Sequence, residues 1–157
     1  MQIRFTKHTG KAHTIKYIRD DGTETWMQAD EFFIRHDLSH YALEKTLGYK
    51  TAFNGMINSG MDIKDFEDRQ KRQAMKMTNE AAYAENMANL FLGEVLQGNF
   101  EDFNAVQQQT LHFINPQIPA LNLDENNIQA VRTCLRQLLE DWEALPGGET
   151  MEFAFDI

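Results

Sequence analysis

Apolar and polar residues alternate near the start of the chain, at residues 3–5 and again at residues 15–17. A period of two is typical of half-buried β-strands, whose successive side chains point to opposite faces. The pair Asp21-Gly22 favours a tight hairpin turn, because these residues tolerate the positive φ angles that such a turn needs. A returning strand begins at residues 25–27. This pattern predicts a three-stranded antiparallel meander.

The last segment of the sequence, residues 151–157, alternates in the same way and follows a Pro-Gly-Gly turn signal at residues 146–148. Because an unpaired apolar strand invites aggregation, we expect this segment to pair with the meander. The residues that would share one face of this strand are Met151, Phe153, Phe155 and Ile157.

The residues between these strands have helical periodicity. The clearest helix follows Asp124, an N-cap candidate, and ends at Pro146. Apolar residues recur along it at spacings of three and four, which is typical of an amphipathic helix with one core-facing stripe. They are Ile128, Val131, Leu135, Leu138, Trp142 and Leu145.

Further helices are predicted at residues 51–58, 78–96 and 102–113. No linker interrupts this order. Strands at both ends of a helical middle predict an α+β fold, with residues 1–157 forming a single domain. The apolar side of the helix at 78–96 is expected to consist of Ala81, Ala84, Ala88, Phe91 and Val95.

Residues 36–44 carry the pattern His-Asp-x-x-His-x-x-x-Glu, and Gly48 follows as a C-cap candidate. On a helix, His36, His40 and Glu44 would lie within about 80° of arc on one face. Two imidazole nitrogens and one carboxylate oxygen suit Zn²⁺, or Fe²⁺ as a facial triad, so these three residues are the predicted metal ligands. Water at an open coordination position could then act as a nucleophile.

Asp37 has two alternative roles. Residues 32–35 are mostly apolar and partly β-like, so we expect the helix to begin near Asp37, with this carboxylate as N-cap and His36 just outside the helix. Alternatively, Asp37 is a fourth ligand, a base, or a partner that orients an imidazole, and it is the predicted catalytic residue.

A metal-free interpretation stays open. His36 and His40 could be half-buried histidines bonded to carboxylates, with Glu44 pairing with His40 one turn away. The motif also lacks the His-Glu-x-x-His pattern of metalloproteases. Further ligands would come from elsewhere in the chain, and the candidates are His112, Glu80, Glu85 and Glu94. Of these, His112 lies between two apolar residues and is expected to be a packed histidine.

The chain has 15 Lys and Arg against 24 Asp and Glu, and a net charge of −9 excludes a generally basic nucleic-acid binder. Residues 1–78 hold 13 basic and 11 acidic side chains (+2), whereas residues 79–157 hold 2 and 13 (−11). If the acidic half packs over the motif, its carboxylates would favour a cation there.

The chain has one cysteine, so we expect no disulfide within it, and a reducing cytoplasm is the predicted location. It also has no apolar run near the roughly 18 residues that a membrane span needs, so no membrane contact is predicted.

The motif and the residues after it resemble a family of small uncharacterised bacterial proteins, which also have an N-terminal hairpin with an Asp-Gly turn. The residues that carry this resemblance are 36–44, Leu47-Gly48, 53–55 (Phe-Asn-Gly) and Gly60. The resemblance covers roughly residues 1–65 and implies no activity. The motif is less similar to a ubiquinone-biosynthesis family with a His-Asp-x-x-His zinc motif. The zinc motif of that family includes a glutamate further downstream, and this chain has no carboxylate at residues 45–61.

These features predict two functions of different classes. The first is a divalent-metal-binding protein that works as a metal-dependent hydrolase, although no phosphate loop or nucleophile elbow identifies its substrate. The second is a non-catalytic interaction or assembly module with a structural histidine network, forming a homo-oligomer by strand pairing at a sheet edge. A metal with four protein ligands would instead be structural.

Overall fold

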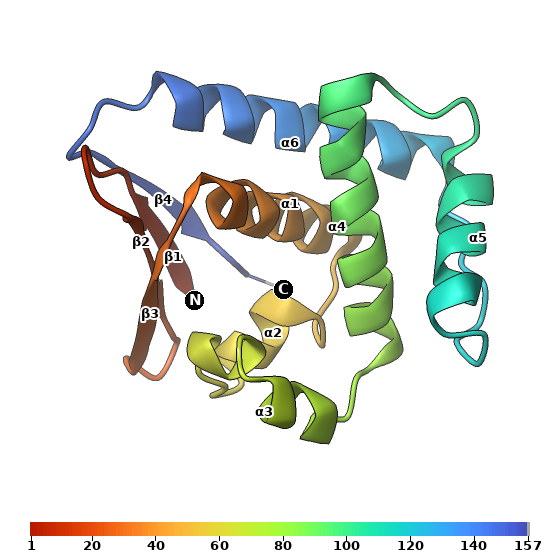
Figure 1. Cartoon of the computed structure of the whole chain (residues 1–157), viewed down its shortest axis with the longest axis horizontal. Helices are drawn as coiled ribbons and strands as arrows, with labels where there is room; N and C mark the ends of the chain where they lie inside the picture. Colours follow the sequence, from red (N-terminus) through yellow and green to blue (C-terminus); the bar gives the residue numbers. More distant parts are fainter. Residues whose placement is uncertain (157) are drawn as a thin grey trace.

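The computed structural model describes residues 1–156 and has the α+β fold that the sequence predicts (Figure 1). One antiparallel sheet has the strand order β3-β2-β1-β4. Its strands are β1 (Gln2–Thr6), β2 (His13–Ile18), β3 (Glu24–Ala29) and β4 (Thr150–Ala154). The predicted pairing of the C-terminal strand with the meander is confirmed, since Ile3 of β1 lies opposite Phe153 of β4. Ile157, which the sequence assigns to that strand, lies outside the described residues.

Helices form the middle of the chain, as expected. In order they are α1 (Glu31–Leu47), α2 (Phe53–Asn58), the 3₁₀ helix η1 (Ile63–Phe66), α3 (Arg69–Ala74), α4 (Asn79–Gln97), α5 (Phe103–Ile114) and α6 (Glu125–Ala144). The predicted N-cap of the last helix is confirmed, since Asp124 accepts a hydrogen bond from the Asn127 N–H and begins α6. On α4 the predicted alanine face is buried, but Val95, near its end, is 37% exposed.

Helix α1 lies at the centre of the molecule, beside the sheet and in contact with both α4 and α6 (Figure 1). The inner face of the sheet and the α6 stripe form one apolar core with Ile34, Leu38 and Leu43 of α1. Because neighbours cover α1 on several sides, polar residues on its α4-facing side are also buried. The motif residues 36–44 therefore lie inside the fold rather than on its surface.

The prediction that the motif helix begins near Asp37 is wrong. The helix begins at Glu31, and its N-cap is Asp30, whose carboxylate accepts a hydrogen bond from the Phe33 N–H at 3.0 Å. An Asp cap followed by a glutamate in the first turn satisfies free N–H groups and suits the helix dipole, which explains the earlier start. His36 consequently lies within the helix, one turn before His40. The predicted C-cap is confirmed, because Gly48 has a φ of 70° and its N–H bonds to the Glu44 carbonyl.

Candidate metal centre

Two histidines one turn apart on α1 form the base of the site. Their rings lie side by side, with centroids 4.7 Å apart. The His36 side chain is 17% exposed and that of His40 is 3% exposed. A helix brings residues four apart to the same face, so the start of α1 at Glu31 is what places the two imidazoles together.

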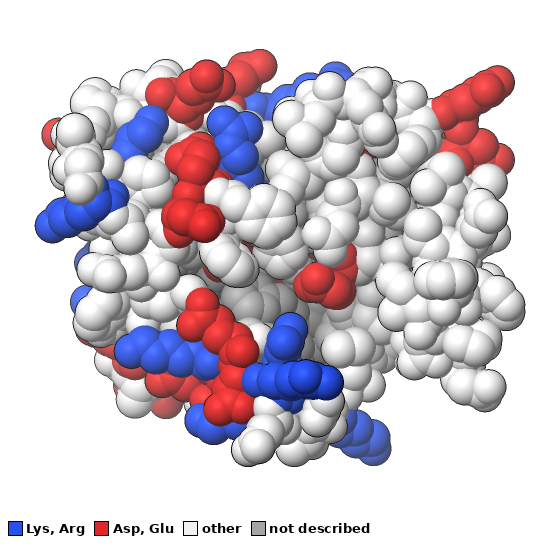
Figure 2. Space-filling view, viewed as in Figure 1, with Lys and Arg blue, Asp and Glu red and all other residues white. Residues whose placement is uncertain are grey.

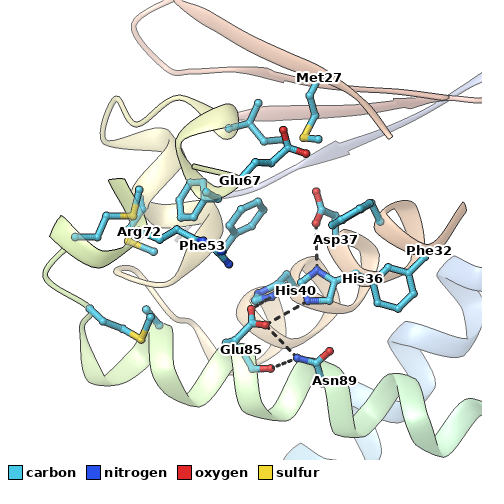
Figure 3. Close-up of a pocket in the computed structure, with 17 residues that line it drawn as sticks. Met27, Phe32, His36, Asp37, His40, Phe53, Glu67, Arg72, Glu85 and Asn89 are labelled. Carbon is cyan, nitrogen blue, oxygen red and sulfur yellow. Dashed lines mark hydrogen bonds and ion pairs between the residues drawn. The ribbon is translucent and has the colours of Figure 1, made fainter. Parts of the chain in front are cut away.

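A carboxylate from α4 meets both rings. Glu85 places Oε2 3.2 Å from Nε2 of His40 and Oε1 3.7 Å from Nε2 of His36 (Figure 3). One turn further along α4, Asn89 donates its Nδ2 to Oε1 of Glu85 at 3.1 Å. The packing of α4 against α1 thus brings together residues 45 positions apart in the sequence.

The other nitrogen of each ring faces a carboxylate from α1 itself. Oε1 of Glu44 lies 3.0 Å from Nδ1 of His40, and Oδ1 of Asp37 lies 3.4 Å from Nδ1 of His36. We call Asp37 and Glu44 the outer carboxylates. Both histidines therefore have a carboxylate of their own helix on Nδ1 and turn Nε2 toward Glu85.

Each outer carboxylate is held by a further donor. Glu44 is fully buried, and its second oxygen accepts the backbone N–H of Asn54, at the start of α2, at 2.8 Å. Oδ2 of Asp37 lies 3.5 Å from the hydroxyl of Tyr17 on β2. Burial and the nearby charges of Asp37 and Glu44 raise the pKa of Tyr17, so this hydroxyl keeps its proton. The two imidazoles are thus oriented from behind by the sheet and by α2.

The charges of this cluster depend on one another. Burial alone would lower the pKa of His40, but its hydrogen bonds to Glu44 and Glu85 outweigh burial and raise the pKa to about 10. The pKa of His36 is raised too, because bonds to Asp37 and Glu85 again exceed the effect of burial. Hydrogen bonds from both rings hold the pKa of Glu85 well below its usual range. Glu85 thus favours the protonated form of both rings, and the two rings favour the ionised form of Glu85.

His36, His40 and Glu85 form a group that could hold a metal ion, since one ligand atom from each lies within 4.8 Å of the others. Bonds of about 2.0–2.1 Å in a tetrahedral site put ligand atoms roughly 3.3 Å apart. The 3.2 Å between Oε2 of Glu85 and Nε2 of His40 is close to this value, and Oε1 of Glu85 lies 3.7 Å from Nε2 of His36. A carboxylate on Nδ1 leaves Nε2 as the ligand atom and is the usual outer partner of a metal-bound histidine.

A pocket of about 460 Å³ opens beside this group. Figure 2 shows it as a hollow in this face of the molecule, with both acidic and basic side chains around it. His36, Asp37, His40 and Glu85 line one part, as Figure 3 shows. The remaining lining is mostly phenylalanine and methionine, from β3, α1, α2, η1 and residues 67–77. The three residues that could hold a metal ion therefore line a space of small-molecule size.

The structure separates the residues that the sequence predicted as a single set of ligands. His36 and His40 come together, whereas Glu44 lies on the opposite side of the His40 ring from Glu85. Asp37 orients His36 and lines the pocket. Glu85 belonged to the four further candidates, with no signal that set it apart from the others.

The other three candidates lie elsewhere. Glu80 accepts the backbone N–H groups of Lys50 and Thr51, and Glu94 pairs with Arg132. His112 is exposed on α5, so the expectation of a packed histidine is wrong. The apolar side of α5 turns Leu111 inward, and the neighbouring position consequently points to solvent.

Comparison with family models, curated proteins and solved structures yields no match to this chain. Within residues 1–156, every helix is too short or too polar to cross a membrane.

Proposed function

We propose that this protein binds one divalent transition-metal ion through Nε2 of His36, Nε2 of His40 and the carboxylate of Glu85. The observation that carries this proposal is the orientation of the two rings: each has a carboxylate on Nδ1, and both Nε2 atoms face the same glutamate. Glu85 takes the ligand position that the sequence predicted for Glu44. Glu44 then has a positioning role toward His40, and Asp37 has the corresponding role for His36.

Two imidazoles and one carboxylate are a ligand set for Zn²⁺ and equally for Fe²⁺. Three protein ligands would leave at least one coordination position open, and all three residues line the pocket. A metal with an open position lowers the pKa of bound water toward about 7, which makes hydrolysis the simplest reaction for this centre. We therefore propose a metal-dependent hydrolase acting on a small molecule.

The competing interpretation is a metal-free network that ties α1 to α4. It is favoured by the hydrogen bonds of His40, whose two ring nitrogens both have carboxylate partners. In this case Glu85 would act as a counter-ion to two protonated rings, and the protein would be an interaction module. In the first function a metal ion displaces the protons from Nε2 of the two rings. In the second function these protons stay bound when metal ions are added.

Titration calorimetry of metal-depleted protein with Zn²⁺, and anaerobically with Fe²⁺, tests the metal site. We expect one equivalent to bind. Glu85→Gln should weaken binding by roughly 100-fold or more, beyond the effect typical of an outer partner. Glu85 is 56% exposed, so this variant should still fold. Glu140→Gln, an exposed change on α6, is the matched control and should have no effect.

Absence of binding, or binding that Glu85→Gln leaves unchanged, would contradict the metal site and favour the metal-free network. The reaction needs its own measurement, because a metal can also be structural. Hydrolysis of p-nitrophenyl esters should depend on added metal and disappear in Glu85→Gln. Tight metal binding without any hydrolysis would exclude the hydrolase while leaving the metal site in place.

A further inference from the structure

The walls of the pocket differ from its metal-ligand end. Aromatic and thioether side chains make up most of its lining, and some of them are unusually exposed: Phe32 is 58% exposed, Phe33 43% and Met77 63%. Large apolar side chains left open to solvent around one hollow are typical of a surface that a ligand covers. The other aromatic and thioether residues of the lining include Phe53, Phe66, Met56 and Met75.

One wall of the pocket is made by residues that contribute little to the core. Helix α3 has no buried residue, and its main neighbour is η1. Met75 and Met77, which follow α3, nevertheless line the pocket. Apolar residues at these two positions do little for the stability of the core, so a ligand in the pocket is the better explanation for them. Methionine suits this role because it adapts to irregular apolar shapes.

The polar groups are confined to one part of the pocket and to its rim. His36, His40 and Glu85 lie together beside Asn89, as Figure 3 shows. Glu67 and Arg72, one acidic and one basic, are exposed residues of the lining, and their charges offset one another. The pocket therefore has no excess of charge at its rim and a single polar end.

The volume limits the size of the ligand. Filled to the density of an organic liquid, 460 Å³ would hold a molecule of roughly 12 to 15 non-hydrogen atoms. We propose that the pocket binds an apolar molecule of this size, alkyl or aromatic, whose single polar head lies at the His36–His40–Glu85 group. This inference rests on the proposed function for the head of the molecule, whereas the binding of its tail depends on the walls alone.

A series of n-alkyl hydroxamates tests the combined site, because the hydroxamate head binds Zn²⁺ or Fe²⁺ and the tail length can be varied. On the metal-loaded protein, affinity should rise about fourfold per methylene, as each CH₂ leaves water. The rise should stop near octano- to decanohydroxamate, when the pocket is full. Met77→Gln should weaken octanohydroxamate about fivefold and leave acetohydroxamate unchanged. Leu96→Gln, which alters an exposed apolar residue outside the pocket, is the control.

A second series, n-alkanols on metal-free protein, separates this inference from the proposed function. Affinity that rises with chain length and falls in Met77→Gln would support the apolar pocket even if no metal binds. Hydroxamates that bind equally at every tail length would overturn the inference while leaving the metal site standing. Binding that rises with tail length but ignores Met77→Gln, or rises without limit, would also overturn it, since the tail would then lie outside this pocket.

Discussion

At the scale of single residues, the motif divides into two histidines that face a shared point and two carboxylates that stand behind them. Glu44 is one turn beyond His40, and this spacing lets it reach Nδ1 of that ring. The Nε2 atoms of both rings face Glu85, which comes from α4. The motif thus predicted the two histidines of the candidate site, whereas its third residue depends on how α4 packs against α1.

Replacing Glu44 tests this division of roles. Glu44→Gln should weaken Zn²⁺ binding by about 10- to 100-fold rather than abolish it, since an outer carboxylate orients the ring and raises its basicity. Titration calorimetry alongside Glu85→Gln gives the comparison. If Glu44→Gln removes binding more completely than Glu85→Gln while the fold is retained, Glu44 is the ligand and the assignment is reversed.

Proton binding to His40 should make the stability of metal-free protein depend on pH. The pKa of this ring is about 10 in the folded chain and about 6.5 in an unfolded one. Because the folded state holds the proton more tightly, the stabilisation is complete below pH 6.5 and is lost as the pH rises through 10. Urea unfolding at pH 6, 8 and 10 should show the advantage of wild type over His40→Gln shrinking at the highest pH. A constant difference would mean that folding does not raise the pKa of this ring.

At the scale of secondary-structure elements, the site depends on where α1 begins and on how α4 packs against it. The mostly apolar residues 32–35 favour a partly β-like interpretation by their residue types. In the structure they belong to α1, and Phe32 and Phe33 line the pocket instead of the core. The local feature that marks the true start is the N-cap Asp30, which the sequence prediction did not use. Turns and caps elsewhere, at Gly48 and Asp124, follow from local chemistry and were predictable.

The left-handed conformation of Gly48 sets the end of α1. Gly48→Ala should lower the free energy of unfolding by about 1 kcal/mol, because a Cβ disfavours a φ of 70° even where it meets no neighbouring atom. Gly48→Asn should cost less, since asparagine tolerates this conformation. Chemical denaturation measures both. Equal stability of Gly48→Ala and wild type would show that the end of α1 relaxes freely.

A buried ion pair fixes α4, the helix that supplies Glu85, against α6. Arg132 donates two hydrogen bonds to Glu94, at 2.9 and 2.7 Å, and both side chains are less than a tenth exposed. Arg132→Met should cost about 3–5 kcal/mol, because it leaves the Glu94 carboxylate buried without its partner. Adding Glu94→Leu should restore part of that loss in the same unfolding assay. A double variant no more stable than Arg132→Met alone would contradict this.

At the scale of the whole molecule, the candidate site combines residues from the two halves of the chain, which differ in net charge. The motif comes from the nearly balanced half of the chain and Glu85 from the acidic half, which does pack over the motif through α4. Composition could indicate this arrangement but not which carboxylate would reach the histidines, because Glu80 and Glu94 are engaged elsewhere. The sheet ends at β3 and β4, and pairing of two copies along one of these edges stays a prediction.

A metal bridging α1 and α4 should stabilise the entire fold. At a free Zn²⁺ concentration 100 times the dissociation constant, the gain is about 2.7 kcal/mol. For a chain of 157 residues this corresponds to a rise in melting temperature of roughly 5–10 °C. Thermal melts monitored by circular dichroism should show the rise in wild type and in Glu140→Gln. The same rise in Glu85→Gln would place the stabilising ion elsewhere.

The most direct test of the central claim is anomalous diffraction at the zinc edge, from crystals grown with one equivalent of Zn²⁺. The account predicts one strong peak about 2.0–2.2 Å from Nε2 of His36, Nε2 of His40 and a carboxylate oxygen of Glu85, with Glu44 still on Nδ1 of His40. A peak bound to Glu44, or no peak between α1 and α4, would contradict it.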